Sequence, residues 1–182
     1  MASPGDVVFF DSLVWHAGGS NQTDNYSIYI DNFNVFWTLL RIKKGSKNVL
    51  KLGNLYAKRD WGYAKEFVYA MWLIMQKKKP DDYVISTSKS YTVKEFINLV
   101  CQELRIKIVW KGKGYNEAAF LGNKKIISID KKYFRPTEVN SLRGNFYKAK
   151  KHLKWKPKTD LKKLVKIMVN NEFEELKLRN FL

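Results

Sequence analysis

The sequence predicts an α/β fold for most of the chain. From Leu40 onward, short apolar runs alternate with segments in which apolar residues recur at helical spacing. Two of these helical segments carry recognisable start signals. The chain has 182 residues, of which 45% are hydrophobic and 15% aromatic, so it is large and apolar enough to bury one substantial core.

The first helix is predicted at residues 63–76, where apolar side chains recur on almost every face. This pattern is typical of a helix that is buried all round. Three lysines at 77–79 and then Pro80 are expected to end it. Lysines complement the negative end of the helix dipole, and a proline interrupts helical hydrogen bonding.

The second helix is predicted to begin at Thr92, which forms a capping box with Glu95. Its apolar stripe consists of Val93, Phe96, Ile97, Val100, Cys101 and Leu104. The single cysteine in that stripe is expected to be a buried apolar side chain and not a nucleophile. It has no partner for an internal disulfide, which favours a cytoplasmic location. A last helix is predicted after Pro157, capped by Thr159.

Short strands are predicted between these helices, at 83–85, 106–110 and 125–129. The N-terminal part also has strand-like apolar runs, including an alternating one at 26–30. A linker rich in Lys, Gly, Ser and Asn follows at 43–48. We therefore expect a β segment at 1–37 and a separate α/β portion at 38–182.

The net charge of +17 comes from 34 lysine and arginine residues against 17 aspartate and glutamate residues. Such an excess favours an anionic ligand or partner. The basic residues are mostly lysines scattered along the chain, so solvated faces are favoured over a nucleic-acid surface. No apolar run approaches the roughly 20 residues of a membrane span, and the first residues lack a secretory signal pattern. No membrane partner is therefore expected.

Two segments have compositions that suit ligand binding, at 52–62 (LGNLYAKRDWG) and 133–139 (YFRPTEV). Arg59 lies just before a helix, where a guanidinium and backbone N–H groups together suit a diphosphate. Arg135 supplies donors for phosphate or ribose oxygens, and Glu138 supplies an acceptor for hydroxyl groups. Asn54 is expected first as a turn former. The alternative, a surface salt bridge beside a turn, stays open on pattern alone.

Four stretches, LGNLYAKRDWGYAKEFVYAMW, DDYVISTSKSYTVKEF, DKKYFRPTEV and KAKKHLKWKPKT, occur in that order. In wording and order they resemble the C-terminal, substrate-binding portion of the GDP-mannose 4,6-dehydratases, which are extended short-chain dehydrogenase/reductases. The resemblance implies a Rossmann-like fold, a lyase of nucleotide-sugar biosynthesis and GDP-mannose or a related GDP-sugar as the ligand. It also implies that Arg59 contacts the diphosphate, Arg135 the diphosphate or ribose, and Glu138 a ribose hydroxyl. Asn54 belongs to the same motif.

The chain also departs from that family. It contains no G-x-x-G-x-x-G pattern, and the family's catalytic Thr, Glu and Tyr-x-x-x-Lys would lie upstream of Leu40. Tyr147 and Lys151 match the last spacing, but in a context that favours coincidence. We therefore expect an incomplete portion that is inactive alone and binds no cofactor by itself. NADP is implied for the family, and a second chain could supply the Rossmann half.

Two other functions remain open at this point. One is a non-catalytic module that binds a nucleotide-sugar or another polyphosphate, and the other is a basic nucleic-acid-binding protein. A homo-oligomer is also left open.

Residues 5–30 resemble something different, the end of a phytanoyl-CoA dioxygenase-type domain. In that family the histidine of a Trp-His pair is an iron ligand, and His16 matches it. The rest of the iron-binding triad is missing, and no arginine follows at the spacing that holds 2-oxoglutarate. We therefore expect a fragment of that fold without a working metal site.

Overall fold

The computed structural model describes residues 29–134 and 139–178. Its helices are α1 (Tyr29–Lys43), α2 (Ala64–Met75), α3 (Val93–Glu103), α4 (Tyr147–Leu153) and α5 (Leu161–Leu178). Its strands are β1 (Leu50–Leu52), β2 (Lys58–Arg59), β3 (Tyr91–Thr92), β4 (Val109–Lys111), β5 (Ala118–Leu121) and β6 (Lys124–Ile129). Short 3-10 turns lie at Gly114–Asn116 and Lys131–Tyr133. The expected α/β class is confirmed.

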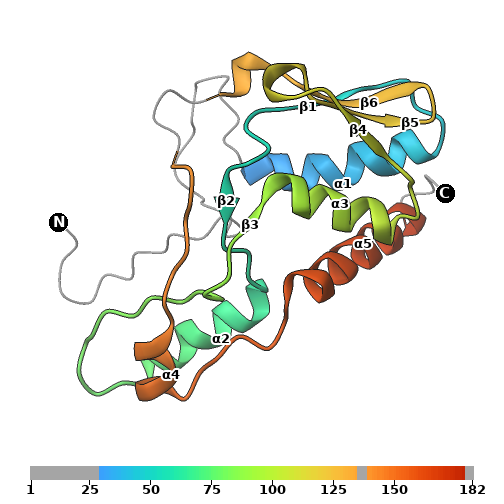
Figure 1. Ribbon diagram of the computed structural model, residues 1–182. Helices are drawn as coiled ribbons and strands as arrows, with labels where there is room; N and C mark the ends of the chain where they lie inside the picture. The colour runs from blue at the N-terminus through green and yellow to red at the C-terminus, as the bar shows by residue number, and fades with distance from the viewer. Residues whose placement is uncertain (1–28, 135–138, 179–182) are drawn as a thin grey trace, which may run out of the picture.

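The main sheet has four strands in the order β1-β6-β5-β4. Strand β1 runs parallel to β6, with Leu50 opposite Ile127, and the other two pairings are antiparallel. Figure 1 shows α1 and α3 beneath this sheet and α5 packed below α3. A separate two-stranded sheet joins β2 to β3 and leads down to α2 and α4.

The larger core lies between the sheet and helices α1, α3 and α5. Phe96 is at its centre, stacked on Trp61 at 5.0 Å and met edge-on by Phe36 at 5.6 Å. The predicted stripe of α3 is confirmed, because the side chains of the stripe contribute to this core. Burial also raises the pKa of the Cys101 thiol to about 12, which confirms an unreactive apolar role.

A smaller core holds α2 against α4. It consists of Phe67, Ala70, Ala149, Leu153 and Trp155. Glu66 stabilises this packing, because its backbone carbonyl accepts a hydrogen bond from Trp155 Nε1 at 2.9 Å. Its carboxylate accepts another from Thr159 Oγ1 at 2.7 Å.

The expectation that α2 is buried all round is wrong. Only Phe67 and Ala70 are buried, and large apolar side chains of the helix are exposed. The helix contacts α4 and the segment around Trp155, which cover only one of its sides. Apolar periodicity gave the position of this helix correctly, but it does not show what covers the other side.

Two further local expectations are also wrong. Residues 83–85 are not a strand, since no strand of the described part of the chain pairs with them. Thr159 does not cap α5, because its hydroxyl is bound to Glu66. The cap is Asp160, whose Oδ1 accepts a hydrogen bond from Lys163 N at 2.8 Å. The capping box of Thr92 and Glu95 is confirmed.

The expected boundary between residues 37 and 38 lies inside α1. This helix continues unbroken across it, with Phe36 and Leu39 buried in the same core. The strand expected at 26–30 is wrong for its last two residues, because helix α1 already begins at Tyr29. The linker at 43–48 does follow the helix as a turn and loop. The earlier residues, including His16, lie outside the described part of the chain.

Candidate functional site

The described ends of the 133–139 segment lie beside the 52–62 segment. The first contact is at Gly53, where an added Cβ would collide with the backbone carbonyl of Tyr133. Only glycine allows the two backbones to approach so closely. Nearby, Asp130 N donates a hydrogen bond to the carbonyl of Leu52 at 2.8 Å. The segment before residue 135 is thus held against the 52–54 turn.

The second contact fixes the chain just after residue 138. Arg59 Nη1 donates hydrogen bonds to the carbonyl of Val139 at 2.7 Å and to that of Lys58 at 2.9 Å. Lys58 N donates to Asn140 O at 2.8 Å, and Leu142 N donates to Lys58 O at 3.0 Å. Residues 139–142 therefore run beside β2 like a third strand.

These contacts tether the chain on both sides of residues 135–138. Arg135 and Glu138 themselves lie outside the described residues. The flanking positions, Tyr133 and Val139, are held by Gly53 and Arg59 respectively. The part of the site that the structure describes thus brings both sequence segments to one place.

Asp60 was not singled out in the sequence, yet it joins three segments here. Its Oδ1 accepts hydrogen bonds from Thr87 N at 2.9 Å and from Thr87 Oγ1. Its Oδ2 accepts one from Gly144 N at 3.4 Å. Gly144 is packed so tightly that a Cβ there would collide with the Ser86 side chain. The only sequence signal for this role is that Asp60 adjoins Arg59.

Asn54 forms a turn, as expected. Its Oδ1 accepts a hydrogen bond from Tyr56 N at 2.9 Å, which is an Asx turn. The Tyr56 hydroxyl then donates to Glu117 Oε2 at 2.8 Å. This turn is therefore anchored to the sheet as well as to the segment that carries Tyr133.

Glu117 is the centre of a partly buried ionic cluster that sequence reasoning missed. Its side chain is 3% exposed and accepts a hydrogen bond from Lys94 Nζ at 2.5 Å. This bond raises the pKa of Lys94. The ammonium also lies 4.8 Å from the centroid of the Trp110 ring. The cluster links the first turn of α3 to the 54–56 turn and to β4.

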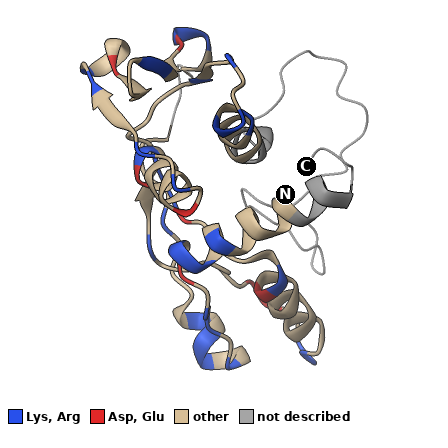
Figure 2. Cartoon of the chain, turned by 90° about the vertical axis from the view of Figure 1, so that its right-hand side faces the viewer, with Lys and Arg blue, Asp and Glu red and all other residues tan. Residues whose placement is uncertain are grey.

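The excess positive charge is not gathered at this site. Figure 2 shows lysine and arginine on several separate elements of the ribbon, with few acidic residues between them. Among the described residues, this distribution agrees with lysines spread over several faces.

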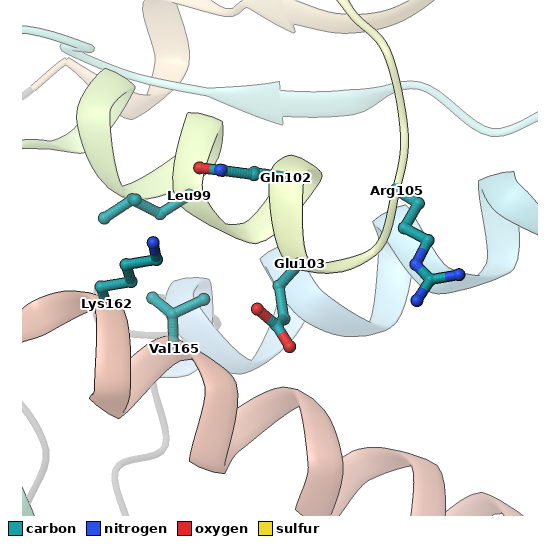
Figure 3. A pocket seen from close by; sticks show the side chains of 6 residues that line it. All are labelled: Leu99, Gln102, Glu103, Arg105, Lys162 and Val165. Atoms are coloured by element: carbon teal, nitrogen blue, oxygen red, sulfur yellow. The ribbon is translucent and has the colours of Figure 1, made fainter.

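A groove of about 330 Å³ lies elsewhere, between α3 and α5. Its lining residues are Leu99, Gln102, Glu103, Arg105, Lys162 and Val165. In Figure 3 the guanidinium of Arg105 and the ammonium of Lys162 point to different sides, with the Glu103 carboxylate between them. The two cations therefore do not converge on one anion, and none of the predicted site residues lines this groove.

No metal-binding group of three or more His, Cys, Asp or Glu side chains occurs among the described residues. Tyr147 and Lys151, which match the family's catalytic spacing, both lie on the exposed surface of α4. None of the helices in the described ranges is long and apolar enough to span a membrane.

The fold is similar to those of several solved structures. RMD from Pseudomonas aeruginosa, complexed with NADPH, matches with a TM-score of 0.60 and 17% identity over 84% of this chain and 44% of its own. UDP-glucose 4-epimerase from Thermotoga maritima matches with a TM-score of 0.59 and 20% identity over 81% and 40%. At 20% identity or less these likenesses show a shared fold, which covers less than half of each of the two solved chains.

A family model for GDP-mannose 4,6 dehydratase matches residues 21–168. The chain is 45% identical to the enzyme of that name from Dictyostelium discoideum over 135 residues, and 42% identical to the human one over 139 residues. These matches cover 73% and 75% of this chain. This chain belongs to the GDP-mannose 4,6 dehydratase family.

The chain spans 38% of the Dictyostelium relative and 37% of the human one. The family match starts at residue 21. The match therefore extends into the expected N-terminal segment, 1–37.

Proposed function

We propose that this chain binds a GDP-sugar, GDP-mannose or a close relative, as the substrate-binding portion of a GDP-mannose 4,6-dehydratase. The observation that carries the proposal is the hydrogen bond from Arg59 to Val139, which joins the two segments whose residues suit a nucleotide diphosphate. Family membership supports the same ligand.

In this proposal Arg59 has two roles. It holds the backbone that follows Glu138, and its half-buried positive charge faces the ligand's diphosphate. Arg135 binds the diphosphate or the ribose, and Glu138 accepts a hydrogen bond from a ribose hydroxyl. Asn54 contributes by shaping the turn against which Tyr133 packs.

The complete dehydration needs more than this portion. NADP would accept and return the hydride, and we propose that it is held by a part of the family fold outside the matched segment. The 182-residue chain then binds substrate without converting it. The proposal places this binding in the cytoplasm, which is supported by the single, buried and unreactive thiol of Cys101.

The test is calorimetric titration of GDP into the wild type and into variants at physiological salt. Arg59→Ala should weaken binding about ten- to a hundredfold, since one charge-assisted contact contributes about 1.5–3 kcal/mol. Arg59→Lys should restore only part of the affinity, because an ammonium lacks the planar fork of a guanidinium. Glu138→Ala should also weaken binding.

The matched control is Arg41→Ala, which removes the same charge from the surface of α1, where Arg41 lies 5.2 Å from the Trp37 ring centroid. Its GDP affinity should equal that of the wild type. If Arg59→Ala and Arg41→Ala lower the affinity equally, the binding is diffuse and the proposed site is wrong.

A further inference from the structure

Residues 148–166, which we call the lysine strip, concentrate positive charge on α4, on the start of α5 and on the segment between them. The strip contains nine lysines of the chain's 34 lysine and arginine residues, against a single acidic residue, Asp160. Its lysines, all of them exposed, are Lys148, Lys150, Lys151, Lys154, Lys156, Lys158, Lys162, Lys163 and Lys166. Figure 2 shows this charge on α4 and on the first turns of α5.

The segment between α4 and α5 holds its lysines outward. Trp155 and Thr159 are buried, whereas the lysines at 154, 156 and 158 are exposed. Such alternation is the pattern of an extended chain, in which successive side chains point to opposite sides. The inner side is fixed, because Glu66 accepts hydrogen bonds from Trp155 Nε1 at 2.9 Å and from Thr159 Oγ1 at 2.7 Å. The three lysines therefore form a row that faces solvent.

Lys154 has a backbone conformation that disfavours a side chain. It is the C-cap of α4, with φ 58° and ψ 20° in the left-handed region. Glycine is the residue that most often ends a helix in this way, because a Cβ costs energy there. A lysine at this position adds a charge to the row at a cost in stability. Strain that is kept at one residue points to a function of that residue.

Few charges of the strip are neutralised within the described residues. Lys148 forms a salt bridge with Asp81. Asp160 caps α5, where its Oδ1 accepts a hydrogen bond from Lys163 N. No other lysine of the strip has a salt bridge in the part of the chain that the structure describes. Because like charges so close together repel one another, an anionic partner that lies along them is favoured.

The chemistry of the strip matches a row of phosphates. Lysine contacts a phosphate as a point charge, whereas the planar guanidinium of arginine can also read base edges, and the strip contains no arginine. A lipid surface is a weaker match, because helices that bind it also insert apolar side chains. None of the exposed large apolar side chains in the described ranges lies within 148–166. The strip therefore favours the backbone of a nucleic acid.

We infer that the lysine strip binds the phosphate backbone of nucleic acid without reading its sequence. This function goes beyond the proposed GDP-sugar site and does not depend on it, since none of the residues proposed to bind the GDP-sugar belongs to the strip. In Figure 1 the strip runs from α4 along the lower edge of the molecule to α5, whereas Arg59 lies above it on β2.

The test is fluorescence anisotropy of labelled DNA, as a duplex and as a single strand, each in two unrelated sequences. The 182-residue chain is titrated into each at several salt concentrations. The two sequences should bind with similar affinity, and the logarithm of the association constant should fall linearly with that of the salt concentration, because each neutralised phosphate releases counterions. Lys154→Gln, Lys156→Gln and Lys158→Gln combined should weaken binding at least about tenfold and reduce the salt slope by about 2–3.

The matched control combines Lys43→Gln, Lys47→Gln and Lys125→Gln, which remove the same charge from exposed positions outside the strip. This variant should bind DNA nearly as tightly as the wild type. Equal losses in the two triple variants would overturn the inference, because the attraction would then depend on net charge alone. It would also be overturned if the wild type bound phosphatidylserine–phosphatidylcholine vesicles but not DNA, or strongly preferred one of the two sequences.

Lys154→Gly separates binding from folding. It removes one charge of the row together with the strain of the left-handed backbone, so it should raise the urea midpoint of unfolding. The same variant should bind DNA less tightly, with a salt slope lower by about 1. A purely structural role of Lys154 would not weaken binding in a more stable protein. Binding by Lys154→Gly with the affinity and salt slope of the wild type would contradict the inference.

Discussion

Arg59 Nη1 lies 2.7 Å from the carbonyl oxygen of Val139, although the two residues are 80 positions apart in the sequence. Around this bond Lys58 exchanges backbone hydrogen bonds with Asn140 and Leu142. The arginine expected to bind a ligand therefore also holds the end of the other segment that is expected to bind it. Any substitution of Arg59 will affect both functions, so the variants below test the segment's attachment separately.

Gly53→Ala tests how the chain just before residue 135 is held, at the contact between Gly53 and Tyr133. The new Cβ would collide with the carbonyl of Tyr133, so the backbones must separate. We expect a loss of about 1–3 kcal/mol in the free energy of unfolding together with weaker GDP binding. Urea denaturation and calorimetry measure the two effects. The control is Gly45→Ala. A Cβ at Gly45 would contact no neighbouring atom, but the residue has a φ of +98°, which strains any side chain other than glycine's. This variant should therefore lower the free energy of unfolding without changing the GDP affinity.

The pair of Lys94 and Glu117 should behave as a coupled unit. Lys94→Met leaves the Glu117 carboxylate buried, with the Tyr56 hydroxyl as its remaining partner among the described residues. We expect this change to cost about 2–3 kcal/mol of unfolding free energy. Adding Glu117→Met should recover a large part of that loss, since no buried charge then remains. Additive losses in the double variant, measured by denaturation, would contradict the coupling.

The capping box of α3 predicts a pH effect. Hydrogen bonds from the Thr92 backbone and side chain lower the pKa of Glu95 below its ordinary value. A lowered folded-state pKa stabilises the fold above the unfolded value of about 4.3, and the effect is lost as the pH falls through the folded value. Thr92→Ala should therefore cost about 1 kcal/mol at neutral pH, and less in acid. Thermal unfolding at pH 7 and pH 3 measures this difference, and an equal cost at both would be inconsistent with it.

The 182-residue chain should not convert GDP-mannose when NADP is added. It contains no G-x-x-G-x-x-G pattern, and Tyr147 and Lys151 are exposed on α4. Product analysis by mass spectrometry, with material shown to be free of host dehydratase, measures this directly. A 4-keto-6-deoxy sugar above the level of a no-protein control would show that the chain has its own catalytic site.

Local sequence signals predicted the parts of the fold that depend on neighbouring residues. The stripe of α3 and the capping box at Thr92 were predictable because both are set by spacing within one helix. The strand expected at 83–85 failed because a strand needs a partner, and pairing depends on distant residues. The exposure of α2 was missed for a related reason, since apolar periodicity does not show which faces of a helix the rest of the fold covers.

The sequence predicts residues for the candidate site, but it does not predict which side chains hydrogen-bond to one another there. Resemblance to the dehydratases predicts Arg59, Arg135, Glu138 and Asn54 as site residues. The structure brings the described residues on either side of 135–138 next to the 52–62 segment. Asp60 and Glu117 were missed because their partners, Thr87 and Lys94, become neighbours only through the fold.

Binding selectivity tests the central claim most directly. GDP, ADP and pyrophosphate should be titrated into the wild-type chain at physiological salt, where diffuse attraction to a net charge of +17 is largely screened. The proposed site predicts that GDP binds more tightly than ADP, because GDP is the nucleotide of the proposed ligand, and more tightly than pyrophosphate, which lacks the ribose. Equal affinities for all three ligands would show that the chain attracts any polyanion and has no GDP-sugar site.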